Sequence, residues 1–191
     1  SILSKTAERI IGRSLVPFLQ QRCFGSNQWA FSPGLSARDL VTALLMNWIL
    51  AICKGSKVAA YLSDITGAFD RVFRDYMLAK LHNAGVGTQF LNFLSSYLQP
   101  RKAVVVVEGT VSDEITIADQ VFQGTVLGPP LWNSFFADIV RPASSSGGTP
   151  SIFADDLNVF RILIEKGQMR NATKRCFLVA LQYIGGVKST E

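Results

Sequence analysis

The chain has 191 residues, 48% of them hydrophobic, and a net charge of +5 from 19 lysines and arginines against 14 acidic residues. That length and composition allow one sizeable domain with a buried core and exclude a generally disordered chain. The basic balance is compatible with a polyanionic partner such as nucleic acid, although many basic proteins bind none. The three scattered cysteines and the single histidine exclude a disulfide framework and a zinc site built on several histidines, so we expect an intracellular protein, in the nucleus or the cytoplasm, rather than a secreted one.

No part of the sequence is typical of a signal peptide or a membrane span. The longest predominantly apolar run, residues 40–53, is bounded by Asp39 and Lys54 and is too short to cross a bilayer easily. We therefore expect a buried helix there and no membrane association. The chain begins with serine rather than methionine, which favours a fragment of a longer polypeptide.

The first third of the chain is predicted to form helix, loop, helix and strand. Apolar residues between positions 2 and 18 recur at roughly the spacing of an amphipathic helix, and residues 25–34 are rich in turn formers. A second helix is predicted over residues 36–53. An apolar strand over residues 57–64 then ends on a carboxylate, Asp64.

The rest of the chain alternates helices with hairpins. Such a mixture predicts an α+β fold in which a small antiparallel sheet packs on helices. The predicted elements are helices near 73–84 and 88–99, hairpin strands over 103–108 and 114–118 around Gly109, a helix over 131–140, a loop over 143–150, strands over 151–154 and 157–163, and a last helix over 168–183.

Two adjacent aspartates, Asp155 and Asp156, are predicted at the tip of the last hairpin. Like charges side by side on a partly buried turn repel each other, so such a pair favours a bound cation or raised pKa values. For an isolated pair, the alternative is an exposed acidic turn without a function.

A third carboxylate, Asp64, changes this balance. If the strand that ends at Asp64 lies beside the hairpin, three carboxylates meet at one edge of the sheet. Such hard oxygen ligands suit Mg²⁺, or Mn²⁺ in its place, and leave positions for substrate phosphates. Two such ions stabilise the attacking and leaving oxygens of a phosphoryl transfer. Asp70, in the first turn of the following helix, is predicted to cap that helix instead of joining the site.

Three motifs around these carboxylates resemble those of reverse transcriptases from non-LTR (LINE-type) retrotransposons. Asp64–Val72 is similar to motif A of that family, Phe122–Pro129 to motif B, and Phe153–Asp156 to motif C. Their order and spacing fit the family, and Gln28–Phe31 lies where its fingers motif falls. The resemblance covers nearly the whole chain.

The resemblance implies a polymerase right hand with helical fingers pieces in residues 1–56, a palm over most of residues 57–191, and no recognisable thumb. It implies an RNA-directed DNA polymerase that adds a deoxynucleotide (dNTP) to the 3′-hydroxyl of a DNA primer on an RNA template. One alternative is a catalytically inactive retroelement remnant that at most binds nucleic acid. An RNA-dependent RNA polymerase is another, but Phe69 and the form of motif C argue against it. The sequence does not indicate an oligomeric state.

The resemblance also assigns roles to the residues of the predicted metal site. Asp64 and Asp155 would bind both ions, the backbone carbonyl of Ile65 would add a ligand, and Asp156 would assist from the same turn. The prediction from the residues themselves agrees, because each aspartate lies at a strand end.

Three further residues match positions that contact the nucleotide in the family. Phe69 matches the bulky position under the incoming sugar, where a ring would clash with a 2′-hydroxyl. Gln123 and Gly124 match the pair that lies against the nucleotide and the template, where glycine permits close backbone approach. From the residues alone, Phe69 is a core aromatic and Gln123-Gly124 is a turn.

The chain departs from the family pattern in several places. Ser32 and Leu35 occupy positions that are usually basic, which removes charge-assisted contacts to triphosphate or template. Arg38 is near enough to compensate, although a helix-surface arginine is the plainer interpretation. Phe122 replaces a common proline. Lys188 is a candidate for the motif D lysine, a general acid for pyrophosphate departure, although a solvated terminal lysine fits its setting better.

Scattered basic residues are candidates for contacts with a nucleic-acid backbone, although each one alone is better explained as a solvated surface charge. These residues are Arg71, Arg74, Arg101 and Lys102.

Overall fold

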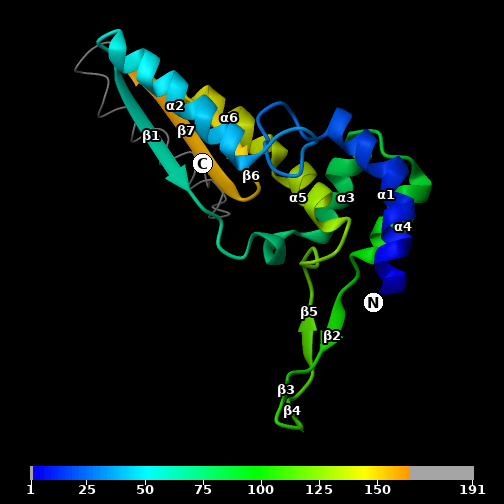
Figure 1. Ribbon diagram of the computed structural model, residues 1–191. Helices are drawn as coiled ribbons and strands as arrows, with labels where there is room; N and C mark the ends of the chain where they lie inside the picture. The colour runs from blue at the N-terminus through cyan, green and yellow to red at the C-terminus, as the bar shows by residue number, and fades with distance from the viewer. Residues whose placement is uncertain (1, 164–191) are drawn as a thin grey trace, which may run out of the picture. The chain divides into compact units, whose positions relative to one another are not determined.

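A computed structural model describes residues 2–163 of the chain (Figure 1). The predicted last helix over residues 168–183 and Lys188 lie outside the described residues. The chain divides into two compact units. We call residues 1–23 with 67–135 the helical unit, and residues 24–66 with those from 136 onward the sheet unit.

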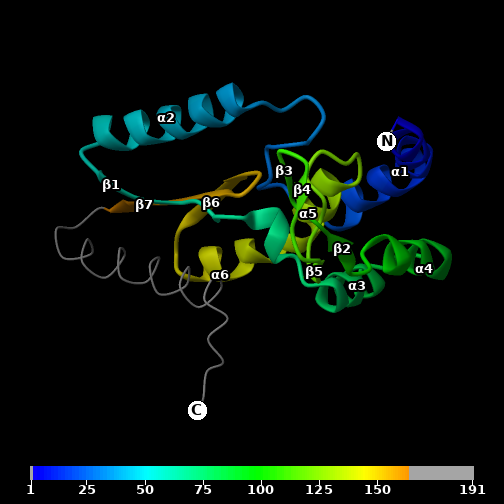
Figure 2. The ribbon, with the colours of Figure 1, turned by 90° about the horizontal axis from the view of Figure 1, so that it is seen from below.

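The sheet unit is built on a three-stranded antiparallel sheet of strand order β1-β7-β6. Figure 2 shows helix α2 over one face of this sheet and helix α6 over the other. The elements are α2 (Ala37–Cys53), β1 (Lys57–Ser63), a 3₁₀ helix η2 (Ala137–Ile139), α6 (Val140–Ser145), β6 (Thr149–Phe153) and β7 (Asp156–Leu163).

The core beneath α2 follows from the alternation of side chains along the strands. Leu40 and Leu44 of α2 are buried against Phe160 of β7. The ring of Trp48 meets Phe160 edge-on, with 6.2 Å between the ring centroids. Because successive strand residues point to opposite faces, the buried neighbour Val159 lies on the other face of β7. Residues of β7 with even numbers therefore face α2.

Helix α2 begins and ends as the sequence predicts, but the expectation of a buried helix is wrong, because only Leu40, Leu44 and Ala51 are buried and its other face exposes large apolar side chains. Ser36 is its N-cap, and its side-chain oxygen accepts a hydrogen bond from the backbone N–H of Asp39 at 3.3 Å. No helix among the described residues is long and apolar enough to span a membrane.

The predicted loop over residues 143–150 is wrong at both ends, because α6 continues to Ser145 and β6 already begins at Thr149. Serine and glycine dominate this stretch and indicate a loop by composition alone. Helix α6 tolerates Pro142 because it lies in the first turn, where the missing N–H has no helical partner to lose.

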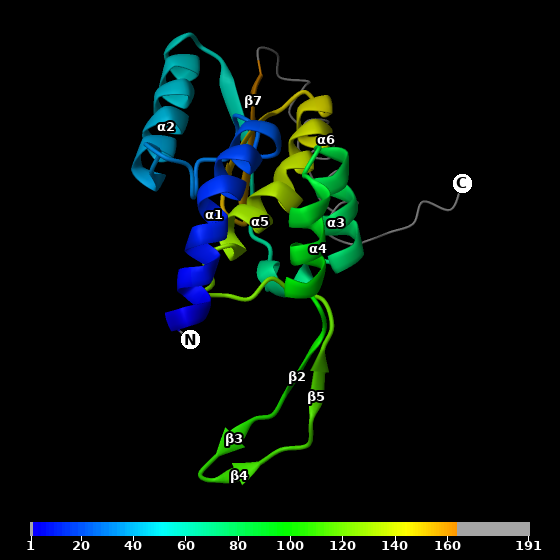
Figure 3. The ribbon, with the colours of Figure 1, turned by 90° about the vertical axis from the view of Figure 1, so that its right-hand side faces the viewer.

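The helical unit carries a long β-hairpin, which Figure 3 shows extending away from α3 and α4. Its elements are α1 (Ile2–Arg22), a 3₁₀ helix η1 (Ala68–Arg71), α3 (Arg74–Asn83), α4 (Thr88–Tyr97), β2 (Arg101–Ala103), β3 (Val106–Val107), β4 (Thr110–Val111), β5 (Ile115–Ile117) and α5 (Gly128–Phe136), whose last residue belongs to the sheet unit.

The predicted hairpin is confirmed, but it forms two short ladders rather than one. Strand β2 pairs with β5, and β3 pairs with β4. Glu108 and Gly109 form the turn between β3 and β4, with φ values of 48° and 82°. Positive φ at both central residues is the pattern of a type I′ turn, which matches the twist of a hairpin.

Helix α1 forms as predicted, but it buries only some of its apolar residues, among them Leu15 and Leu19. Ile2 and Leu3 are 85% and 82% exposed, whereas Glu8 is only 4% exposed. Gly12 and Leu15 are buried on the same side as Glu8, at helical spacing. The buried face therefore combines leucines with a polar residue and a glycine, and the contacts of these last two are with the motif B turn.

Candidate active site

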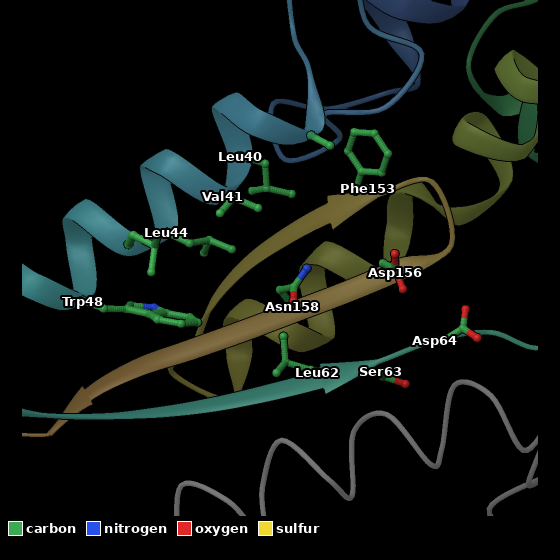
Figure 4. A pocket seen from close by; sticks show the side chains of 12 residues that line it. Leu40, Val41, Leu44, Trp48, Leu62, Ser63, Asp64, Phe153, Asp156 and Asn158 are labelled. Atoms are coloured by element: carbon green, nitrogen blue, oxygen red, sulfur yellow. The ribbon is translucent and has the colours of Figure 1, made fainter.

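Asp64 and Asp156 lie at neighbouring strand ends on one face of the sheet. In the antiparallel ladder of β1 and β7, Ser63 is opposite Leu157, so one further step brings Asp64 opposite Asp156. Figure 4 shows both carboxylates at this end of the sheet. The expectation that the strand ending at Asp64 lies beside the hairpin is therefore confirmed.

Asp155 belongs to the turn that joins β6 to β7. Phe153 pairs with Asp156, which leaves Ala154 and Asp155 as the two central residues of the turn. Ala154 has a φ of 57°, and Asp155 has no positive φ. A positive φ at the first central residue alone is the pattern of a type II′ turn, in which glycine is the usual residue. The structure thus holds an L-residue in a backbone conformation that it rarely adopts.

The three carboxylates repel one another. Partial burial raises the pKa of the Asp156 carboxyl above its usual value, and the negative charges of Asp155 and then Asp64 raise it further. Because the Asp156 side chain is largely exposed, burial alone does not account for its raised pKa, and the charges of its neighbours contribute as well. The repulsion favours a bound cation at this end of the sheet.

A pocket of about 560 Å³ lies between α2 and the sheet and reaches these carboxylates (Figure 4). Its wall on the helix side is apolar, and Leu40, Leu44 and Trp48 contribute to it. Asp64 and Asp156 line the pocket together with polar and apolar neighbours of the two strands. Polar groups thus converge at one side of an otherwise apolar hollow, as in many ligand sites.

The donor set fits Mg²⁺ but does not form a closed cage. Among residues 2–163, no three or more His, Cys, Asp or Glu side chains are gathered closely enough to hold a metal ion. Mg²⁺ is usually held by one or two carboxylates together with substrate phosphates and water, so a set of two carboxylates is enough in number, and Asp64 and Asp155 stay the predicted ligands. The backbone carbonyl of Ile65 directly follows Asp64 and is the predicted further ligand.

The residues predicted to contact the nucleotide belong to the helical unit. Phe69 is half-buried, and its ring lies 5.8 Å from that of Trp132 between centroids. Gln123 and Gly124 are exposed in the turn before α5, and Gly124 has a φ of 80°, which favours glycine. Their nucleotide contacts stay predictions. Arg38, in the sheet unit, is exposed on the first turn of α2, and its substrate contact also stays a prediction.

Several basic residues near the hairpin have internal contacts. The Arg101 guanidinium lies 3.8 Å from the centre of the Phe122 ring, a cation–π contact. Phe122, which replaces the common proline of motif B, is thereby paired with a residue at the base of the hairpin. Arg74 donates hydrogen bonds to the backbone carbonyl and the hydroxyl of Ser95, so it joins α3 to α4. Lys102 forms an exposed ion pair with Glu114 across the hairpin at 2.6 Å.

The capping role predicted for Asp70 is wrong. The 3₁₀ helix that contains Asp70 has no side-chain cap, and the backbone N–H at the start of α3, from Arg74, donates to the carboxylate of Asp119 at 3.1 Å. Asp119 follows the hairpin in sequence, so only the folded chain brings it to this helix end.

A buried carboxylate that the sequence did not single out holds the motif B turn. The Oε2 of Glu8 accepts hydrogen bonds from the backbone N–H groups of Val126 and Leu127 at 2.6 and 3.1 Å. Gly12, one turn along α1, lies close to the side chain of Leu127. Glu8 is therefore buried because the turn needs its acceptor. A lone acidic residue among apolar helix positions was the available signal.

Carboxylates at the ends of adjacent strands, in a sheet covered by helices on both faces, fit the predicted palm of a polymerase fold. The chain belongs to the reverse transcriptase family: residues 1–180 match the family described as Reverse transcriptase (RNA-dependent DNA polymerase).

The chain is similar to polymerases of mobile elements. The chain is 30% identical over 163 residues to the probable RNA-directed DNA polymerase from transposon BS of Drosophila melanogaster. It is 33% identical over 163 residues to the RNA-directed DNA polymerase from mobile element jockey of Drosophila funebris. Each match covers 82% of this chain and 18% of the relative, so the chain spans about 18% of the length of these relatives. The predicted membership among non-LTR retrotransposon reverse transcriptases is confirmed.

The fold has a solved counterpart. It is similar, with a TM-score of 0.62 at 11% sequence identity, to apo telomerase from Candida tropicalis truncated from its C-terminal domain. The match covers 95% of this chain and 38% of that chain. At this identity the likeness concerns the fold alone, and it confirms the predicted α+β polymerase class.

Proposed function

We propose that this chain supplies the active site of an RNA-directed DNA polymerase that transfers a nucleotide from a dNTP to the 3′-hydroxyl of a DNA primer. The observation that carries the proposal is the position of Asp64 opposite Asp156, with Asp155 next to it in the turn, within a chain of the reverse transcriptase family. An RNA template is the partner that the family description suggests. An intracellular location belongs to the same proposal.

The carboxylates act as fixed ligands. Asp64 and Asp155, with the Ile65 carbonyl, would hold Mg²⁺, for which Mn²⁺ can substitute, and Asp156 would assist. When bound, the ions neutralise charge that develops on the phosphate during transfer. Because Asp64 follows β1 directly and Asp155 lies in the tight turn between β6 and β7, their backbone is fixed before the ions bind, which is an advantage for an electrostatic site.

The remaining substrate contacts are proposed on the family resemblance. The Phe69 ring would lie under the sugar and exclude a 2′-hydroxyl. Gln123 and Gly124 would lie against the base pair that forms, and their exposure leaves them available. Arg38 would contact the triphosphate or the template, and Lys188 would protonate the departing pyrophosphate.

Primer extension on an RNA template with Mg²⁺ tests the proposal. We expect the 191-residue chain to extend a DNA primer with dNTPs and Asp155→Ala to abolish extension. Asp113→Ala is the matched control, because Asp113 is an exposed aspartate on the hairpin. It should extend primers at the wild-type rate.

The same assay separates the competing functions. If the wild-type chain extends primers no better than Asp155→Ala, the chain is an inactive remnant. Ser32 and Leu35, which occupy positions that are usually basic in the family, favour that alternative. Preferential use of ribonucleotides would identify an RNA polymerase instead.

A further inference from the structure

Residues 27–29 form a short parallel addition to the free edge of β6. The backbone N–H of Trp29 donates to the carbonyl of Ile152 at 2.9 Å, and the N–H of Ile152 donates to the carbonyl of Asn27 at 2.8 Å. Gln28, between them, is 3% exposed. Its backbone is therefore fixed beside the hairpin that carries the aspartates.

The Gln28 side chain binds both backbone groups of one residue in the turn of that hairpin, the N–H and the carbonyl of Ala154. Its Oε1 accepts a hydrogen bond from the backbone N–H of Ala154 at 3.0 Å, and its Nε2 donates to the backbone carbonyl of Ala154 at 3.3 Å. The same Oε1 accepts from the N–H of Ala30, also at 3.0 Å, which fixes the orientation of the amide. A buried amide with these partners is locked in place.

The turn needs such support for two reasons. Ala154 has a φ of 57°, a conformation that glycine adopts readily and alanine rarely. The turn also carries Asp155 next to Asp156, opposite Asp64, so like charges push it away from its place. Hydrogen bonds to the peptide groups around Ala154 oppose both effects.

We propose that Gln28 is a positioning residue of the candidate active site, which holds the Ala154 backbone in the turn so that Asp155 and Asp156 keep their aim toward Asp64. The inference rests on the proposed function, since it supposes that these aspartates bind metal. Gln28 touches no substrate and acts only through the turn, as residues behind metal ligands commonly do.

Three variants of the 191-residue chain test this role. Gln28→Met removes both hydrogen-bonding groups at nearly constant volume. Asn27→Ala is the matched control, because the Asn27 side chain ties the same segment to the far end of β6, donating to the Pro150 carbonyl at 2.8 Å. Gln28→Met combined with Ala154→Gly tests rescue, because glycine adopts the turn conformation without the amide.

The readouts are Mn²⁺ affinity of the chain without substrate, measured by electron paramagnetic resonance, and hydrogen–deuterium exchange of the peptide over residues 152–157. We expect Gln28→Met to weaken Mn²⁺ binding by about tenfold, the lower end of the usual effect of such residues. Exchange at the Ala154 amide should accelerate. In primer extension, kcat should fall by a similar factor while KM for the dNTP changes less than about twofold. The double variant should regain at least about a third of the lost Mn²⁺ affinity, and Asn27→Ala should bind Mn²⁺ as the wild type does.

Several results would overturn the inference. Wild-type Mn²⁺ affinity in Gln28→Met, an equal loss in Asn27→Ala, or no rescue by Ala154→Gly would each do so while leaving the proposed function intact. If the wild-type chain neither binds Mn²⁺ nor extends primers, the proposed function fails and this inference falls with it. Should Gln28→Met not fold, Gln28→Asn provides the same contrast, because it keeps the buried amide but is one methylene too short to reach Ala154.

Discussion

Asp64, Asp155 and Asp156 carry their mutual repulsion whenever no cation neutralises it. The raised pKa of Asp156, caused by partial burial and then by its two neighbours, expresses this cost. A group of carboxylates arranged to bind cations is expected to be electrostatically unfavourable when no cation is bound. The stability of the metal-free chain should therefore report on the site.

Asp156→Asn should stabilise the metal-free chain at neutral pH. The pKa of Asp156 in the folded chain lies above its unfolded value of about 3.9. The stability that the protonated Asp156 side chain contributes is therefore fully present below pH ~3.9 and is lost as the pH rises through the folded pKa. Melting temperatures measured in a chelator should show an advantage of the variant at pH 7 that vanishes toward pH 4. Mg²⁺ should raise the melting temperature of the wild type more than that of the variant. An advantage that is independent of pH would contradict this account.

Phe69→Val should relax the choice of sugar. The smaller side chain removes the proposed clash with a 2′-hydroxyl, so the ratio of kcat/KM for ribonucleotides to that for deoxynucleotides should rise by about tenfold, the scale expected for a local steric contact. Phe93→Val is the control, since it removes a half-buried ring that stacks on Tyr97 in the same unit. Equal ratios in the two variants would show that Phe69 only packs against Trp132.

At the scale of elements, a remote polar side chain holds each functional turn. Glu8 of α1 binds the turn before α5, and Gln28 binds the turn between β6 and β7. Both side chains are at most 4% exposed. Their burial is tolerated because the backbone groups of the turns satisfy them, and the turns in turn depend on them.

Glu8→Ala should lower the free energy of unfolding by about 2–4 kcal/mol, because it leaves the N–H groups of Val126 and Leu127 without their acceptor. Urea denaturation measures the change. Arg9→Ala, at an exposed position next to it, should stay within about 0.5 kcal/mol of the wild type. A similar loss in both variants would mean that α1 as a whole, rather than this carboxylate, supports the turn.

The sequence predicted those elements well whose boundaries are marked by neighbouring residues. Helices α3 and α4 are separated near Gly85, whose φ of 87° matches the predicted stop. The prediction that the strand ending at Asp64 lies beside the last hairpin is confirmed, and the register places Asp64 opposite Asp156, whereas a metal ion shared by Asp64 and Asp155 stays a prediction. The end of α6 was hidden by its serines, and the burial of Glu8 on α1 was not predicted. Gln28 and its partner Ala154 are 126 positions apart, so no local pattern could pair them.

At the scale of the whole molecule, the motifs are shared between the two units. The carboxylates belong to the sheet unit, whereas Phe69, Gln123 and Gly124 belong to the helical unit. The predicted division into fingers over residues 1–56 and palm from 57 stays a prediction and does not follow the boundaries of these compact units. The chain also spans only about 18% of the length of its relatives. Its contacts with primer and template therefore stay proposals.

The central claim is that Asp64 and Asp155 share a bound metal ion. A crystal structure of the chain with Mn²⁺, which scatters anomalously, tests it most directly. The account predicts an anomalous peak with carboxylate oxygens of both residues about 2.1 Å away. Carboxylates more than about 8 Å apart, with no peak in contact with both, would contradict it, because two catalytic ions sit only ~4 Å from each other.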